Sequence, residues 1–275
     1  MSRNDPAAST EPPAIHHVVS GRGPHITLVH GVGANLHSWD EVTERLEPFF
    51  SVVRLDLRGH GKSGPIVGGC TLEDLASDVR RVWDAIGIAK CHLAGFSLGG
   101  LIAQSLALFD ADRIDRLAII SAVAGRTEEE RLKVVDRLKL LKEGGIAAIT
   151  AAAEERWFTP EFRASHPDRV KRRMAELLAN DAVSYMAAYT VFATSDLGHR
   201  LAEIQHPTLV VTGENDVGSN TRMALMMHEK IKNSRLEILP RLRHSVVVEA
   251  PGTIADLLLE HFGGSTPHGA VAQMP

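Results

Sequence analysis

The sequence predicts an α/β fold in which a mostly parallel central sheet is flanked by helices. Short apolar runs rich in Val, Ile and Leu recur along the chain, and turn residues follow each run. This pattern is typical of parallel strands that are buried on both faces. Helical patterns separate several of the runs, and such alternation favours a parallel sheet. One long segment without a strand pattern adds a helical insertion to this fold.

Six of the apolar runs are candidate strands, and four segments between or after them have the pattern of helices. The candidate strands are residues 26–29, 52–56, 91–94, 117–122, 208–212 and 236–239. The candidate helices are residues 72–86, 98–109, 221–231 and 252–262. Pro251 comes just before the last of these helices, near the first helical position, where proline is favoured.

Residues 125–200 interrupt the alternation because they contain no convincing strand. The segments with helical patterns in this region are 128–142, 146–156, 168–179 and 182–194. An insertion between two strands would lie over one edge of the sheet, and in an open α/β sheet that edge carries the ligand crevice. We interpret this insertion as a cap or lid, and not as an independent domain.

The chain of 275 residues is expected to form one domain with two short tails. The domain is predicted to span residues 15–262, with its core at 15–124 and 201–262 and the cap at about 125–200. Residues 1–14 are polar and proline-containing, and residues 263–275 are rich in small residues and proline. We expect both tails to be disordered.

Composition excludes several classes of protein. The net charge of −4 implies no strong electrostatic field, so nucleic acid is not an expected partner. No run of about 18 apolar residues is present, so no membrane span is expected, and the N-terminus lacks the apolar region of a signal peptide. Two cysteines, Cys70 and Cys91, are too few for a disulfide framework. These features predict a cytoplasmic protein, and no metal-ligand spacing indicates a metal or other cofactor.

Ser97 is the candidate nucleophile. The segment GFSLG, residues 95–99, joins a candidate strand to a candidate helix, which is the setting that supports a G-x-S-x-G motif. The turn is strained, and side chains at the glycine positions would collide with the neighbouring strand and helix. The hydroxyl would lie at a helix N-terminus, where N–H groups favour developing negative charge. A glycine-rich turn with an incidental serine is the alternative; Ser63 and Ser121 lack this setting.

A serine hydroxyl needs an adjacent base, and after a motif of this kind the acid and then the histidine follow in the chain. His244 follows the last candidate strand and is therefore the predicted base. Asp216 follows the preceding candidate strand and is the predicted acid, which would orient the imidazole ring. Glu214, two residues earlier, is the competing acid, and the preference for Asp216 depends partly on the resemblance described below.

Two backbone N–H groups are predicted to stabilise the oxyanion. One belongs to Leu98, directly after the nucleophile, and the other belongs to Val32 in the loop after the first candidate strand. Gly31 and Gly33 flank Val32 and let the backbone turn towards a substrate. His30 is expected to support this loop and not to transfer protons.

These segments together resemble the α/β-hydrolase family over about residues 15–262. The residues that carry the resemblance are His30-Gly31, the run DLRGHGKS at 56–63, the turn around Ser97, Asp216 and His244. The resemblance implies the α/β-hydrolase fold, with the helical cap inserted between strands. It also implies that the Arg-Gly-His-Gly segment braces the loops below the site and carries no catalytic proton.

Within that family the chain is most similar to 3-oxoadipate enol-lactone hydrolases. The similarity lies in the segment RWFTPEFR at 156–163, in the following His166-Pro167 and in the segment LHSW at 36–39. Such enzymes open a small lactone ring that bears a carboxylate in the catabolism of aromatic compounds. The resemblance therefore implies that Arg156 binds the carboxylate and that Trp157 forms a wall of the pocket. An Arg-Trp pair packed within the cap is the alternative.

The sequence thus predicts a serine hydrolase that cleaves a small-molecule carboxylic ester or lactone through an acyl-enzyme and needs no cofactor. A general carboxylesterase, a C–C bond hydrolase and a perhydrolase are alternatives that use the same three residues. A non-catalytic binding protein of the same fold is an alternative from another class, but such proteins often lose one of the three residues, and here all three positions are filled. The sequence does not specify the substrate or the oligomeric state.

Overall fold

The computed structural model describes residues 12–263. The expected tails therefore lie outside the described residues, apart from residues 12–14 and Gly263. Within the described range, one seven-stranded sheet has the strand order β1-β3-β2-β4-β5-β6-β7. The strands are β1 (His17–Gly21), β2 (His25–Val29), β3 (Ser51–Leu55), β4 (Cys91–Phe96), β5 (Ile114–Ile120), β6 (Thr208–Gly213) and β7 (Ser234–Leu239). All neighbours pair in parallel except β1 and β3, which are antiparallel.

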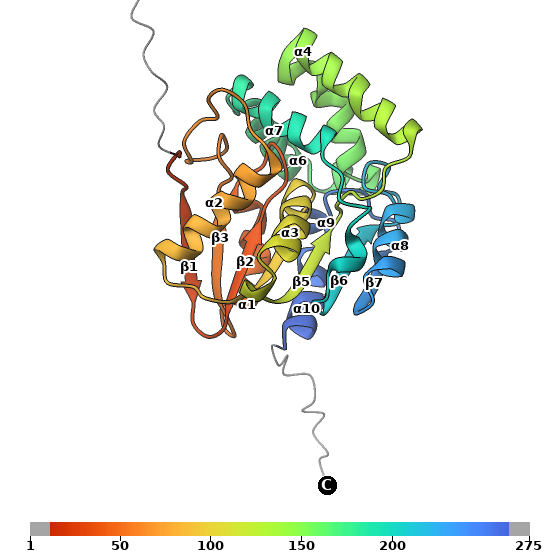
Figure 1. The fold of residues 1–275 in the computed structure, drawn as a ribbon. Coiled ribbons are helices and arrows are strands. Elements are labelled where there is room, and N and C mark those ends of the chain that lie inside the picture. Colours follow the sequence, from red (N-terminus) through yellow and green to blue (C-terminus); the bar gives the residue numbers. More distant parts are fainter. Residues whose placement is uncertain (1–11, 264–275) are drawn as a thin grey trace, which may run out of the picture.

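Helices cover both faces of the sheet, as Figure 1 shows. One face packs against α2 (Leu72–Ala85), α3 (Leu98–Phe109) and α8 (Thr221–Lys230), and the other packs against α1 (Asp40–Leu46) and α10 (Pro251–Phe262). Neighbouring residues of a strand alternate between the two cores: Leu93 of β4 joins the first and Ala94 joins the second. The predicted α/β-hydrolase architecture is confirmed.

Four short helices complete the core. They are the 3₁₀ helices η1 (Leu36–Trp39), η2 (Ala111–Arg113) and η3 (Leu201–Glu203) and the single-turn helix α9 (Val246–Glu249).

No helix among residues 12–263 is both long enough and apolar enough to cross a membrane.

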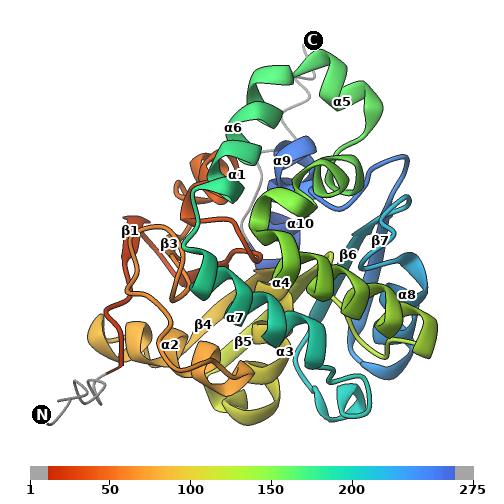
Figure 2. The ribbon, with the colours of Figure 1, turned by 90° about the horizontal axis from the view of Figure 1, so that it is seen from above.

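The chain between β5 and β6 contains the helices α4 (Glu128–Trp157), α5 (Pro160–Ser165), α6 (Pro167–Leu178) and α7 (Ala182–Thr194). Figure 2 looks down on these helices, which lie across the sheet. The backbone of α4 leaves the helical conformation at Gly145, where φ is 66°, so its two halves correspond to the two helices expected there. We call this four-helix region the cap.

Strand β1 and helices α1 and α5 were not predicted from the sequence, and neither were the four short helices of the core. Strand β1 is an edge strand of five residues that are half-buried or exposed, so it lacks the apolar run of a central strand. Helix α5 is only six residues long, too short for helical periodicity to be recognised. Its start was nevertheless signalled by Thr159, whose side chain accepts a hydrogen bond from the Phe162 N–H, and by Pro160 in the first turn.

Candidate active site

Ser97 occupies a sharp turn between β4 and α3, with φ 56° and ψ −115°. A positive φ is strained for any residue with a Cβ atom, and the surrounding packing must hold it in place. Gly95 and Gly99 permit that packing, because a Cβ atom at Gly95 would overlap the Gly99 carbonyl group and one at Gly99 would overlap the Val29 carbonyl group. The turn therefore needs glycine at both positions.

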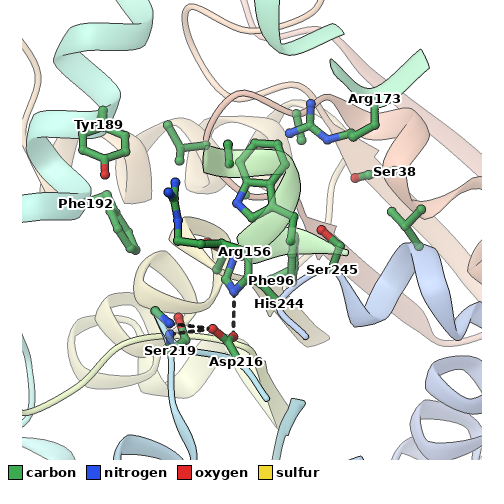
Figure 3. Close-up of a pocket in the computed structure, with 18 of the residues that line it drawn as sticks. Ser38, Phe96, Arg156, Arg173, Tyr189, Phe192, Asp216, Ser219, His244 and Ser245 are labelled. Atoms are coloured by element: carbon green, nitrogen blue, oxygen red, sulfur yellow. Dashed lines mark hydrogen bonds and ion pairs between the residues drawn. The ribbon is translucent and has the colours of Figure 1, made fainter. Parts of the chain in front are cut away.

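Ser97 lies within hydrogen-bonding distance of His244, which in turn contacts Asp216. The Oγ atom of Ser97 is 3.1 Å from Nε2 of His244, and Nδ1 of His244 is 2.7 Å from Oδ2 of Asp216. Figure 3 shows the contact between His244 and Asp216 on one side of the cavity. The three side chains come from the loops that follow β4, β7 and β6 at the carboxyl edge of the sheet; β6 and β7 are neighbours, and β5 lies between β4 and β6.

Asp216 is held as a carboxylate. Its side chain is buried, and burial alone would raise its pKa. The contact with His244 and hydrogen bonds from the N–H groups of Ser219 and Gly218, at 2.9 and 2.8 Å, outweigh burial and hold the pKa of Asp216 below its ordinary value. Glu214 is exposed and accepts a hydrogen bond from the Arg241 N–H at 2.7 Å. The structure thus brings Asp216, and not Glu214, to His244.

The loop after β2 lies directly against the turn that carries Ser97. A Cβ atom built on Gly31 would come 2.9 Å from the Cβ atom of Ser97. Among the described residues, no acceptor is hydrogen-bonded to the N–H groups of Val32 and Leu98. The Leu98 N–H is the first in α3, and the first N–H groups of a helix have no partner within it. Both donors are therefore available next to Ser97.

Two buried histidines hold that loop in position. Nε2 of His60 accepts the Gly33 N–H at 2.9 Å, and Nε2 of His30 accepts the Leu57 N–H at 3.0 Å. The Nδ1 atom of each ring then carries the proton and donates to a backbone carbonyl group. Burial lowers the pKa of His30 to about 3 and that of His60 to about 4, so both rings are neutral near pH 7. The expected supporting position of His30 agrees with these contacts.

A cavity of about 790 Å³, partly open to solvent, lies between this site and the cap. We call it the central cavity (Figure 3). Ser97 and His244 line one side, and the cap contributes three arginines and several aromatic residues to the other. The cap residues of these two kinds are Arg137, Arg156, Trp157, Arg173, Tyr185, Tyr189 and Phe192. The lining is therefore apolar with a few cationic groups, which suits a small organic anion.

Arg156 and Trp157, the two cap residues singled out from the sequence, both line the central cavity. Burial lowers the pKa of Arg156, and the neighbouring Arg137 lowers it further. No hydrogen bond or ion pair joins the Arg156 guanidinium to another residue of 12–263, so its donors are available to a ligand. The Trp157 ring faces the guanidinium group of Arg173, whose Cζ lies 4.7 Å from the ring centroid.

The loop that carries His244 is attached to the cap near Arg156 and Trp157. The Ser245 N–H donates to the Trp157 carbonyl group at 3.0 Å, and Nη1 of Arg243 donates to the Glu155 carbonyl group. The end of α4 and the loop that carries His244 are therefore positioned together. Through these contacts, Arg156 and His244 are held at the wall of the same cavity.

Arg137 and Arg173 also line the central cavity but were not predicted as site residues from the sequence. Arg137 lies in a stretch of α4 in which charged residues are mostly exposed, so nothing distinguished it. For Arg173 a signal was present: the buried positions of α6 are Val170, Arg173, Met174 and Leu177, at the spacing of one helical face. A charged residue on an apolar stripe indicates a buried cation.

A family model described as the alpha/beta hydrolase fold matches residues 24–251. The chain is 29% identical over 239 residues to (E)-2-((N-methylformamido)methylene)succinate hydrolase of Acinetobacter baylyi, covering 86% of this chain and 89% of the relative. It is 29% identical over 228 residues to 3-oxoadipate enol-lactonase 2 of the same organism, covering 83% and 84%. The crystal structure of the enol-lactonase from Burkholderia xenovorans LB400 is similar with a TM-score of 0.87 at 26% identity, covering 93% of this chain and 99% of that one.

Proposed function

The chain belongs to the alpha/beta hydrolase family, and on that premise we propose that it is a serine hydrolase that cleaves a carboxylic ester or lactone through an acyl-enzyme. One observation carries this proposal: the contact series from Ser97 through His244 to Asp216, at the wall of the central cavity. A hydroxyl, a base within reach of it and a carboxylate that orients the base are the parts that nucleophilic acyl transfer requires.

In the proposed first step, His244 takes the proton of Ser97 while the Ser97 oxygen attacks the substrate carbonyl carbon. Asp216 keeps the proton of the ring on Nδ1 and stabilises the imidazolium that forms. The N–H groups of Val32 and Leu98 donate to the oxyanion. The alkoxide or enolate then leaves with the proton from His244.

In the second step, His244 activates a water molecule, which attacks the acyl-enzyme. The acyl group leaves as a carboxylic acid, and Ser97 recovers its proton from His244. When the substrate is a lactone, the leaving oxygen belongs to the same molecule as the acyl group, so a single ring-opened product is released.

We propose further that the substrate is a small carboxylated enol-lactone or a similar ester. The cap arginines support this, because guanidinium groups bind carboxylates through two parallel hydrogen bonds. Arg156 would bind the carboxylate, and Trp157 would form the apolar wall beside it. Two of the similar proteins are named for carboxylated compounds, one as a 3-oxoadipate enol-lactonase and the other as an (E)-2-((N-methylformamido)methylene)succinate hydrolase.

Two measurements on purified protein test the proposal. A fluorophosphonate probe should label the wild type and fail to label Ser97→Ala. Hydrolysis of 3-oxoadipate enol-lactone should exceed hydrolysis of neutral p-nitrophenyl esters in kcat/KM. Folded wild type that is not labelled would favour a non-catalytic binding protein. Labelled protein that prefers the neutral esters would favour a general carboxylesterase and would remove the proposed role of Arg156.

A further inference from the structure

Arg173 is a buried cation that has no hydrogen-bonded partner among residues 12–263 and only one long ion pair. The residue is only 9% exposed, and its Nη1 atom is buried without a hydrogen-bond acceptor among the described residues. An oxygen of Glu176 lies 4.0 Å from Nη1, at the outer limit of an ion pair. Burying a charge is costly unless hydrogen bonds and an opposite charge compensate. The cavity next to Arg173 therefore favours an anion.

Arg126 shows how a buried arginine is compensated in the same protein. It is 4% exposed, and its Nη2 donates to the Phe192 carbonyl group at 2.8 Å while its Nη1 donates to the Ser195 carbonyl group at 3.0 Å. Arg126 thus has a structural explanation within the chain. Arg173 faces the central cavity and has no comparable set of acceptors among residues 12–263.

Arg173 and Arg156 lie at different ends of the central cavity. Arg173 also lines a neighbouring cavity with His37 and Arg169, whereas Arg156 also lines one with Glu214 and Asn215, and these two outer cavities share no residue. In Figure 3, Arg156 lies on the side of Tyr189 and Phe192, and Arg173 lies on the side of Ser38. One cation therefore stands at each boundary of the central cavity.

We propose that Arg173 forms a second anion-binding subsite, so that the cavity takes compounds with two anionic groups, one held by Arg156 and the other by Arg173. This inference rests on the proposed function for its chemistry, since the substrate would be an ester, lactone or related acyl compound with two carboxylates. The guanidinium Cζ atom of Arg173 lies 4.7 Å from the centroid of the Trp157 ring, and a guanidinium group can stack on an aromatic ring and still bind a carboxylate through its N–H groups.

Equilibrium binding to the Ser97→Ala protein tests the subsite without turnover. Succinate, glutarate and adipate are titrated by calorimetry, each beside its monomethyl ester, which has the same chain with one charge fewer. The diacid of matching length should bind about tenfold more tightly than its ester, and Arg173→Met should reduce this ratio to about one. Arg173→Lys, which keeps the charge, should retain part of the preference.

Lys171→Met is the matched control, because Lys171 lies on the same helix, is exposed and does not line the central cavity. It should leave the ratio of diacid to ester unchanged. Equal weakening of diacid and ester by Arg173→Met would mean that Arg173 only supports Trp157, and this would overturn the proposal. If Arg173→Met does not fold, the test is the Ser97→Ala protein with Arg173 intact. If that protein binds no diacid more tightly than its monomethyl ester, the proposal is also overturned.

The outcomes separate this inference from the proposed function. A diacid preference in protein that the fluorophosphonate probe does not label would support the subsite and contradict the hydrolase mechanism. A labelled enzyme that hydrolyses esters but shows no diacid preference would contradict the subsite alone.

Discussion

Nε2 of His244 lies 3.1 Å from the Oγ atom of Ser97, although the two residues are 147 positions apart in the chain. Folding alone creates this contact, because the loop after β7 and the turn after β4 meet at one edge of the sheet.

Replacement of Ser97 by Ala should reduce kcat for ester or lactone hydrolysis by a factor of at least about 10³, because the proposed nucleophile is lost. The melting temperature should change little. Ser121→Ala is the matched control, since the Ser121 side chain is buried, has no hydrogen-bond partner in the described part of the chain and lies outside the central cavity. Near-normal activity of Ser97→Ala would refute the assignment of the nucleophile.

Replacement of Asp216 by Asn should reduce kcat by a factor of about 10³ to 10⁴. The amide group would donate to Nδ1 of His244, so the ring proton would move to Nε2. A protonated Nε2 atom can no longer accept the proton of Ser97. Steady-state kinetics measures the effect. Glu214→Gln is the control and should stay within about twofold of wild type, because Glu214 is exposed and contacts the Arg241 N–H. The opposite order of effects would make Glu214 the functional acid.

Replacement of Arg156 by Met should lower kcat/KM for a carboxylated lactone by about 10- to 100-fold, because one charge-assisted contact to the substrate is lost. Activity on a neutral ester should be nearly unchanged, since no carboxylate is bound. Lys142 is an exposed residue of the same helix, so Lys142→Met should leave kcat/KM unchanged for both substrates. Equal losses on both substrates would indicate that Arg156 supports the cap and does not recognise the substrate.

Replacement of Gly99 by Ala should destabilise the protein by more than about 3 kcal/mol, because the new Cβ atom would overlap the Val29 carbonyl group. Urea unfolding followed by circular dichroism measures the change. Gly87→Ala serves for comparison: its φ is also positive, at 73°, but nothing lies within 4 Å of the added carbon. That variant should lose only about 1 kcal/mol from backbone strain. Equal losses would contradict the packing explanation.

The buried histidines should make folding sensitive to acid. The folded-state pKa of His60 is about 4, below its ordinary value of 6.5. Between these two pH values the unfolded chain binds more protons than the folded chain, so this contribution to stability is fully present above pH 6.5 and is lost as the pH falls towards 4. His30, with a folded-state pKa of about 3, acts in the same direction.

Urea midpoints at pH 7.5, 6.5 and 5.5 measure this dependence in wild type and in His60→Ala. The variant should be less stable than wild type at pH 7.5, because it loses the contact with the Gly33 N–H. It should then decline less steeply on acidification, since one titrating group is absent. An equally steep decline would show that His60 does not contribute to the acid sensitivity.

Local patterns predicted the sheet and the nucleophile turn because those features depend on residues close together in the chain. The apolar runs reveal central strands wherever both faces are buried, as in β2 and β6. The same dependence on burial explains why part of β5 and all of β1 were not predicted. Strand β5 begins at Ile114, three residues before the expected start. Its first part was missed because Asp115 and Arg116 are exposed and interrupt the apolar run. Edge strand β1 is partly exposed along its length and was missed.

The sequence by itself determined where the strand–turn–helix around Ser97 forms, because the G-x-S-x-G pattern that predicts it lies within residues 95–99. It also determined that an acid and a histidine follow in the loops after later strands. The tertiary structure decided that Asp216 and not Glu214 meets His244, since the turn after β6 buries one carboxylate and exposes the other. It also decided that Arg173 lies inside, because the side of α6 that faces the cavity depends on how the cap packs over the sheet.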